Sequence, residues 1–339
     1  VPLYNIIGRS SNFNCDSSSN SLKTSYFCTS GFTIRVPSCK TNLGDSFPLA
    51  RKNIPPNHSE NKSINSNVNT IYLLGTKMLQ WYRDKPLLCD TDRANQTLKW
   101  YSADSEKKFL KQPLEFQKQF EYEIEYKFNK YGHRTKNIED LNDDFLLTFG
   151  CSYTEGIGLC EDQIWNHTLK THLNLDLYNC AKGATGMDIQ YYNTTLWKTN
   201  KLPLPKLVIV QWPQKSRKMF ASTEQKFLEF NDMSETPTHD GRWWGKRYIV
   251  DTAEMSFNNF IWFENFNNIW ESLGVPVFNW TWDDDIEQEV IISSRKLWFV
   301  SPDIKDRARD FDHDGPGFHS DTAERLIKII DSGNFTHKV

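Results

Sequence analysis

The stretch FLLTFGCSYTEGIG, residues 145–158, decides the expected fold. Its first five residues, 145–149, form a short apolar run of the kind that builds a buried strand, and the run stops at Gly150. Cys151 and Ser152 follow side by side, before two further glycines. In open sheets of parallel strands, functional side chains gather at the carboxyl ends of the strands. Either Cys151 or Ser152 is therefore a candidate nucleophile, and a tight polar turn without chemistry is the alternative.

Strand and helix patterns alternate from residue 144 onward. Four apolar runs predict strands at 145–149, 175–179, 206–212 and 275–280, and helical patterns cover 162–173, 187–198, 255–273 and 322–330. This alternation indicates parallel strands joined by right-handed crossovers, with helices on both faces. We therefore expect a three-layer α/β/α fold with a parallel central sheet over residues 142–339.

Two segments of different character precede this domain. Residues 1–77 are rich in Ser, Asn and Thr and lack sustained periodicity, which predicts a poorly ordered or non-native leader, with a short β module as the alternative. Residues 78–141 contain FEYEIEYKF at 120–128, where apolar and charged residues alternate as in a half-exposed strand. We expect a β-rich N-terminal extension there.

The composition argues against several functional classes. A net charge of −3 gives no reason to expect a nucleic-acid partner. No run approaches the ~18 apolar residues of a membrane span, and the polar N-terminus does not resemble a signal peptide. The seven cysteines contain no CxxC pair, so we expect reduced thiols in a cytoplasmic or virion-associated protein, with no zinc site.

The C-terminal block ARDFDHDGPGFHSDTAERLIKII, residues 308–330, supplies the groups that a nucleophile needs. A serine hydroxyl requires a base to take its proton, and an imidazole serves best when a carboxylate fixes its tautomer. Asp310 and His313 stand three residues apart on one loop, a spacing that lets the carboxylate orient the ring. His319 is expected to be structural, with a role as substitute base as the alternative.

These blocks together resemble the SGNH (GDSL-like) hydrolase superfamily over about residues 142–332. The first block matches its G-x-S-x-T-x-G pattern, and the last matches its D-x-x-H ending. The segment YNCAKGATGMD, residues 178–188, resembles the family's second block, a strand end that leads into a glycine loop. The resemblance implies that Ser152 is the nucleophile, His313 the general base and Asp310 its orienting partner. Cys151 stands where the family usually has aspartate.

The resemblance also implies an oxyanion hole made of the Ser152 amide and an amide of the 183–186 loop. Gly183 is the expected loop donor, with Ala184 and Gly186 as alternatives. The family's third block, G-x-N-D, is missing after the strand at 206–212. Gln214 is the expected substitute for its asparagine, and Gln211 is the alternative.

The resemblance thus implies ester hydrolysis through an acyl-enzyme, most naturally of acetyl or short acyl groups on a carbohydrate. Trp243 and Trp244, in a basic segment at 239–248, are expected to contact the substrate, with anchoring of a long loop as the alternative. Neither a metal nor another cofactor is expected, and the sequence does not indicate an oligomeric state.

Two rival readings remain. The missing third block favours a weak or inactive relative that binds carbohydrate or has a structural role. A calcium loop is the other rival, because five residues fit EF-hand-like positions 1, 3, 5, 6 and 12: Asp310, Asp312, Asp314, Gly315 and Asp321. Pro316 and the lack of an entering helix argue against it.

Overall fold

The computed structural model describes residues 25–29, 32–36, 87–89, 91–221, 227–230, 252–283, 286 and 293–333. The chain divides into two compact units, 1–61 and 62–339. In the first unit, strands β1 (Ser25–Thr29) and β2 (Phe32–Val36) pair antiparallel. The rest of the expected leader, residues 1–77, lies outside the described residues.

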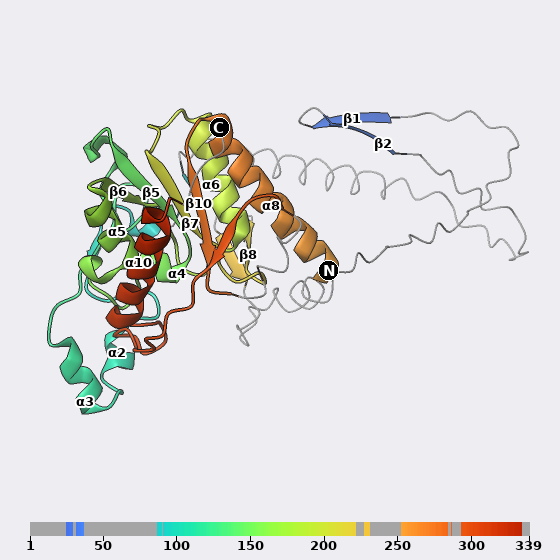
Figure 1. The fold of residues 1–339 in the computed structure, drawn as a ribbon. Coiled ribbons are helices and arrows are strands. Elements are labelled where there is room, and N and C mark those ends of the chain that lie inside the picture. Colours follow the sequence, from blue (N-terminus) through green and yellow to red (C-terminus); the bar gives the residue numbers. More distant parts are fainter. Residues whose placement is uncertain are drawn as a thin grey trace, which may run out of the picture. The chain divides into compact units, whose positions relative to one another are not determined.

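A sheet of five parallel strands forms the centre of the second unit (Figure 1). Its strands are β5 (Phe145–Phe149), β6 (Asp176–Asn179), β7 (Leu207–Gln211), β10 (Val277–Thr281) and β11 (Leu297–Phe299), in the spatial order β11-β10-β7-β5-β6. The four strands predicted from the apolar runs are confirmed to within two residues at either end. Because β6 and β7 lie on opposite sides of β5, the order reverses beside β5, and in open sheets ligand sites form at such a reversal.

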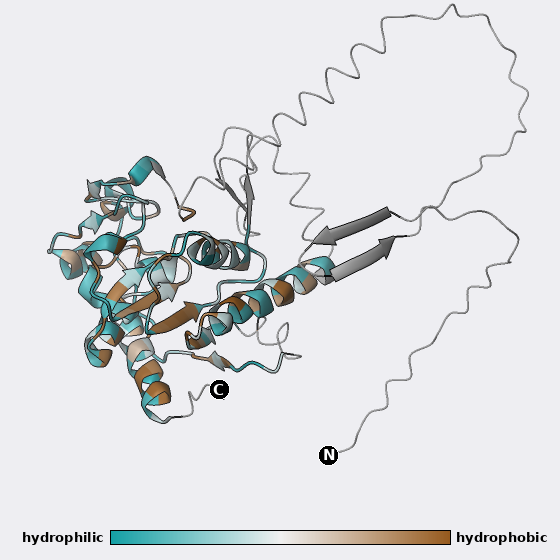
Figure 2. Ribbon diagram, turned by 90° about the horizontal axis from the view of Figure 1, so that it is seen from above, coloured by the Kyte–Doolittle hydropathy of each residue, from teal (hydrophilic) through white to brown (hydrophobic). Residues whose placement is uncertain are grey.

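Helices cover both faces of this sheet, as the sequence predicts. Helices α6 (Met187–Thr199) and α8 (Thr252–Ser272) pack together on one face, and α5 (Trp165–Leu173) and α10 (Pro316–Asp331) pack together on the other. Alternate side chains of β5 enter the two cores: Phe145, Leu147 and Phe149 join the α6/α8 side, and Leu146 joins the α5/α10 side. Figure 2 shows the apolar residues concentrated in the strands between the helices. The fold is a three-layer α/β/α arrangement.

Beyond β7, three of the described strands were not predicted from the sequence. β11 has only three residues, too few for a periodic signal, and β8 (Lys218–Ala221) and β9 (Phe227–Phe230) form a separate antiparallel pair after β7. Short ladders of this kind depend on pairing partners more than on local sequence.

The N-terminal extension differs from its prediction as a β-rich segment. Its described part holds short helices and one short ladder: η1 (Thr91–Arg93), β3 (Thr97–Leu98), α2 (Glu106–Phe109), α3 (Leu114–Gln117), η2 (Lys118–Phe120), β4 (Tyr126–Lys127) and η3 (Ile138–Asp140). The strand expected over 120–128 is confined to β4. The alternation instead buries Phe120, Ile124, Tyr126 and Phe128 in a small aromatic cluster, while Tyr122 stays 38% exposed. Alternating burial therefore arises here without a continuous strand.

None of the helices in the described ranges combines the length and the apolar character that a membrane span requires. Within the same ranges, four cysteines are free thiols: Cys89, Cys151, Cys160 and Cys180.

Candidate active site

The turn after β5 is tight and buried. Strand β5 ends at Phe149, and the one-turn helix α4 (Ser152–Glu155) begins at Ser152, which is only 5% exposed. A Cβ at Gly150 would lie 2.1 Å from Thr154 Oγ1, so this position requires glycine. Gly156 ends α4 with φ +78°, a left-handed conformation that glycine adopts without strain. Both glycines of the motif are thus required by the turn itself.

Gln211, the last residue of β7, ties this turn to the sheet. Its Oε1 accepts hydrogen bonds from Cys151 N (3.3 Å), Cys151 Sγ (3.3 Å) and Thr154 Oγ1 (3.2 Å), and its Nε2 donates to Trp212 O (3.0 Å). The Cys151 thiol is fully buried against this amide. Both ends of the Gln211 amide make hydrogen bonds, so this side chain anchors the turn to the sheet.

Two buried asparagines hold the same turn from the other side. Asn166 on α5 and Asn179 at the end of β6 both donate from Nδ2 to the carbonyl oxygen of Thr154, at 3.2 and 2.8 Å. Asn166 also donates to Thr148 Oγ1, within β5. Hydrogen bonds inside a buried network are strong because water does not compete. The turn is therefore fixed by β5, β6, β7 and α5 together.

Asp310 and His313 form the carboxylate–imidazole pair that their spacing predicts. His313 Nδ1 lies 2.5 Å from Asp310 Oδ2, and Asp310 Oδ1 accepts the backbone N–H groups of Asp312 (3.2 Å) and His313 (3.1 Å). Phe311, with φ 63°, makes the tight turn between them. Burial would raise the pKa of Asp310, but the hydrogen bonds and charge interaction with His313 outweigh it and hold the pKa below its usual range.

Tyr153 brings the two segments together. Its ring packs edge-on against His313 with centroids 5.8 Å apart, and it also contacts Trp282 (5.1 Å) and Phe318 (6.0 Å). Since Tyr153 directly follows Ser152, the nucleophile turn and the His313 loop are neighbours. In the described part of the chain, the hydrogen bond of the His313 ring goes to Asp310, and none joins it to Ser152. Such catalytic contacts are often long before substrate binds.

The loop after β6 lies against Ser152, but the Gly183 amide is already occupied. It donates to Glu155 Oε2 at 2.5 Å, and a Cβ built on Gly183 would lie 3.6 Å from Ser152 Cβ. The expectation that Gly183 is the loop donor therefore conflicts with this hydrogen bond. Ala184, half-buried with φ 60°, is the next amide along the loop.

Gln214 lies in the turn that follows β7, next to the same loop. It is half-buried, and its Oε1 accepts a hydrogen bond from Arg217 Nε at 3.1 Å. A Cβ at Gly186 would lie 2.1 Å from Arg217 O, so the 183–186 loop and this turn touch. The carboxyl ends of β5, β6 and β7 thus meet at one place, beside the reversal in strand order.

The remaining sequence candidates fall elsewhere. Trp243 and Trp244 lie outside the described residues. His319 is buried, its Nδ1 accepts the amide of Trp165 at 3.3 Å, and burial lowers its pKa to about 3. This geometry fits the structural role expected for it.

The carboxylates of the alternative calcium loop do not converge. Asp310 binds His313, Asp312 pairs with Lys108, and Asp321 pairs with Arg325 at 3.0 Å. Across the described ranges, no group of three or more His, Cys, Asp or Glu side chains is arranged to hold a metal ion.

Two buried ion pairs near the site were not anticipated. Arg93 Nη1 lies 2.6 Å from Glu155 Oε1, and Arg309 Nη2 lies 2.6 Å from Asp104 Oδ2. Both pairs connect the N-terminal extension to segments that flank the candidate triad. Arg93 and Asp104 occur in a region without clear periodicity, and Glu155 occupies a variable position of the motif, so only the three-dimensional contacts reveal them.

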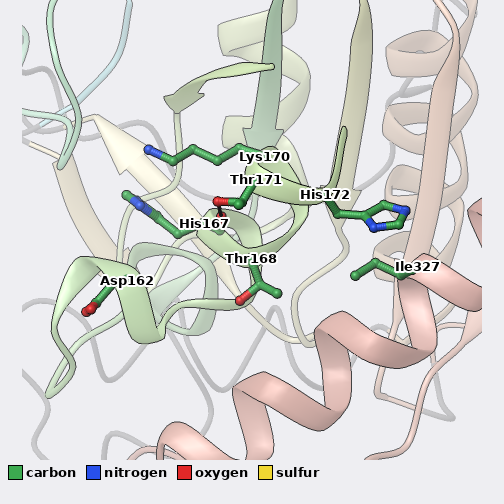
Figure 3. A pocket seen from close by; sticks show the side chains of 7 residues that line it. All are labelled: Asp162, His167, Thr168, Lys170, Thr171, His172 and Ile327. Atoms are coloured by element: carbon green, nitrogen blue, oxygen red, sulfur yellow. Dashed lines mark hydrogen bonds between the residues drawn. The ribbon is translucent and has the colours of Figure 1, made fainter. Parts of the chain in front are cut away.

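A surface pocket of about 520 Å³ lies apart from these residues, along α5 (Figure 3). It is lined by Asp162, His167, Thr168, Lys170, Thr171, His172 and Ile327. His172 lies beside Ile327 of α10, and its Nε2 is 3.1 Å from Asp331 Oδ1. No residue of the candidate triad lines this pocket.

Neither a protein-family model nor a curated protein sequence matches the chain. The solved structures that are similar include the following two. One is an acetyl xylan esterase from the rumen bacterium Butyrivibrio proteoclasticus, with 12% identity, a TM-score of 0.38 and coverage of 57% of this chain and 65% of that one. The other is a carbohydrate esterase with divergent catalytic and non-catalytic binding functions in its active site, with 10% identity, a TM-score of 0.38 and coverage of 56% and 65%. The chain thus spans less than two thirds of either neighbour, and the function has to be argued from the residues.

Proposed function

We propose that this chain is a serine hydrolase of the SGNH type that cleaves esters through an acyl-enzyme intermediate. The observation that carries the proposal is the pairing of buried Asp310 with half-buried His313, 2.5 Å between Oδ2 and Nδ1, on a loop that packs against the residue following Ser152. Acyl transfer needs a serine nucleophile, an imidazole base and a carboxylate that orients the base. Ser152 follows the central strand β5, and the other two groups lie on the 310–313 loop.

In the proposed reaction, His313 donates its Nδ1–H to Asp310, which leaves Nε2 free to accept the Ser152 hydroxyl proton. Ser152 Oγ attacks the ester carbonyl, and His313 then passes the proton to the departing alcohol. Water, deprotonated by the same imidazole, releases the acid and restores the serine. Asp310 stays ionised, because its pKa is lowered, and stabilises the imidazolium as it forms.

The oxyanion would be held by the backbone N–H of Ser152 and by that of Ala184, in place of Gly183. Gln214 Nε2 is the proposed third donor, since its Oε1 is directed to Arg217. Preorganised donors of this kind are commonly worth about 10²- to 10³-fold in rate each. The proposed substrate is an acetyl or other short acyl ester of a carbohydrate, with Trp243 and Trp244 as candidate sugar contacts.

The competing function is a weak or inactive relative that binds carbohydrate. The missing G-x-N-D block favours it, and the side-chain amide of Gln211, the last residue of β7, is hydrogen-bonded to the turn and to Trp212. A binding module would retain the fold and the sugar contacts, and would show no turnover.

The test is hydrolysis of p-nitrophenyl acetate by the purified chain and three variants. Ser152→Ala is expected to abolish turnover, and Asp310→Asn to lower kcat by about 10³- to 10⁴-fold by disturbing the imidazole tautomer. Cys151→Ala is expected to retain turnover, because the thiol is buried against Gln211. Loss of activity in Cys151→Ala alone would move the nucleophile by one residue, and absence of turnover in the parent chain would favour the binding module.

A further inference from the structure

Glu155 is a fully buried carboxylate three residues after the proposed nucleophile. It is the last residue of α4, and its exposed fraction is 0%. An ionised carboxylate is costly to bury unless each oxygen has a partner. Here Oε2 accepts the Gly183 N–H at 2.5 Å, and Oε1 lies 2.6 Å from Arg93 Nη1. The proposed mechanism assigns no role to this carboxylate.

The carboxylate connects the nucleophile turn to the loop that follows β6. A Cβ on Gly183 would lie 3.1 Å from Glu155 Oε2 and 3.6 Å from Ser152 Cβ, so the loop rests against both residues. The hydrogen bond fixes the direction of the Gly183 N–H toward Glu155. Because the Gly183 N–H is engaged, the amide of Ala184, which has φ 60°, is the next candidate donor on this loop.

Arg93 holds the carboxylate from the opposite side. The guanidinium carbon lies 4.5 Å from the centre of the Phe128 ring and 4.8 Å from that of Tyr101, so the cation is clamped between aromatic rings of the extension. The contacts with these two rings hold the Arg93 guanidinium in place, and Arg93 in turn holds the Glu155 carboxylate. The extension therefore reaches the 183–186 loop through the Glu155 carboxylate.

We propose that Glu155 is a positioning residue for the oxyanion hole: by binding the Gly183 amide while paired to Arg93, it sets the 183–186 loop so that Ala184 N–H faces the tetrahedral intermediate. This inference rests on the proposed function. Glu155 does not touch the reacting atoms, and its effect is on the placement of a donor. Displacement of a catalytic group by about 1 Å can reduce a rate by about 100-fold.

A matched pair of double variants isolates the hydrogen bond to Gly183. Removing Glu155 alone would take away the carboxylate that neutralises the buried Arg93 guanidinium, so both variants carry Arg93→Met. Arg93→Met/Glu155→Gln keeps an acceptor oxygen for the Gly183 amide, and Arg93→Met/Glu155→Met removes it at similar volume. With p-nitrophenyl acetate, kcat of the Met double is expected to be about 10- to 100-fold below that of the Gln double, with KM within about twofold. Hydrogen exchange of the 183–185 amides is expected to be faster in the Met double.

Glu155→Asp provides a second test that keeps both charges. Its carboxylate is one methylene shorter, so it can remain near Arg93 but loses reach to Gly183. A fall in kcat with KM within about twofold is expected, beside a lower thermal midpoint, because the buried Gly183 N–H then lacks its acceptor. Equal kcat values in the two double variants, beside an active parent chain, would overturn the role of Glu155 and leave the proposed function standing. An inactive parent chain would overturn the proposed function, and with it this inference.

Discussion

Replacing Asp104 by asparagine is expected to lower the free energy of unfolding by about 3 to 5 kcal/mol. Asp104 is fully buried, and its carboxylate accepts hydrogen bonds from two residues. Arg309 donates from Nε to both oxygens at 3.1 Å and from Nη2 at 2.6 Å, and the Tyr126 hydroxyl donates at 2.5 Å. Asparagine has a similar shape but cannot neutralise the guanidinium, whose side chain is only 5% exposed. Breaking one member of a buried ion pair costs about this much, because it leaves an uncompensated charge.

Urea unfolding followed by tryptophan fluorescence would measure the change, and a thermal scan should show a midpoint lower by on the order of 10 °C. Glu123→Gln is the matched control, since it removes the carboxylate of an exposed pair with Lys99 and is expected to leave the midpoint unchanged. Arg309→Met/Asp104→Leu, which removes both buried charges, is expected to recover most of the lost stability.

The activity of Asp104→Asn should fall as well, because Arg309 directly precedes Asp310 of the proposed triad. An unfolding free energy within about 1 kcal/mol of the parent value would refute the reasoning. It would mean that the Arg309 guanidinium is adequately solvated without its carboxylate, despite its burial.

Three further perturbations test other contacts. Gln211→Leu should lower the unfolding free energy by about 1 to 3 kcal/mol in urea, because it leaves buried donors of the nucleophile turn without an acceptor, and should lower kcat for p-nitrophenyl acetate; an unchanged urea midpoint would contradict this. Arg134→Lys should destabilise by about 2 to 4 kcal/mol, since an ammonium cannot span the carbonyls that the guanidinium now binds, Gly156 O at 2.5 Å and Leu159 O at 2.7 Å; a parent-like midpoint would show that these contacts contribute little. Burial lowers the pKa of His319 to about 3, so this ring stays neutral in the folded chain. In the unfolded chain it takes up a proton below about pH 6.5. The free energy of unfolding should therefore fall as the pH drops from about 6.5 toward 3. His319→Gln should reduce that slope by up to about 1.4 kcal/mol per pH unit, measured by urea unfolding at pH 4, 5, 6 and 7, and an unaltered slope would exclude this residue as its source.

The central sheet was predictable because its signals are local. Strands such as β5 are apolar throughout and buried on both faces, and the helices between them carry periodic apolar residues. The extension was not predictable, since the alternation of residues 120–128 looks the same whether the apolar side chains face a sheet or an aromatic cluster. Which surface these apolar side chains pack against is decided only in the folded chain.

The candidate site also combines a contact that the local sequence predicts with one that depends on distant residues. The pairing of Asp310 with His313 follows from a three-residue spacing on one loop, so the sequence is sufficient to predict it. The state of the Gly183 amide depends on Glu155, which is 28 residues away in the chain and held in turn by Arg93. Contacts between residues this far apart leave no periodic pattern in the sequence, so the hydrogen bond of the Gly183 amide could not be predicted from it.

The pairing of Asp104 with Arg309 also bears on how the chain folds. The two residues are 205 positions apart in the sequence. Contacts of such long range slow folding, because chain entropy must be lost before they form. During synthesis on a ribosome, the Asp104 carboxylate therefore waits for its cation until residue 309 has emerged. The loop that carries Asp310 is expected to become anchored only then, when two segments far apart in the sequence meet.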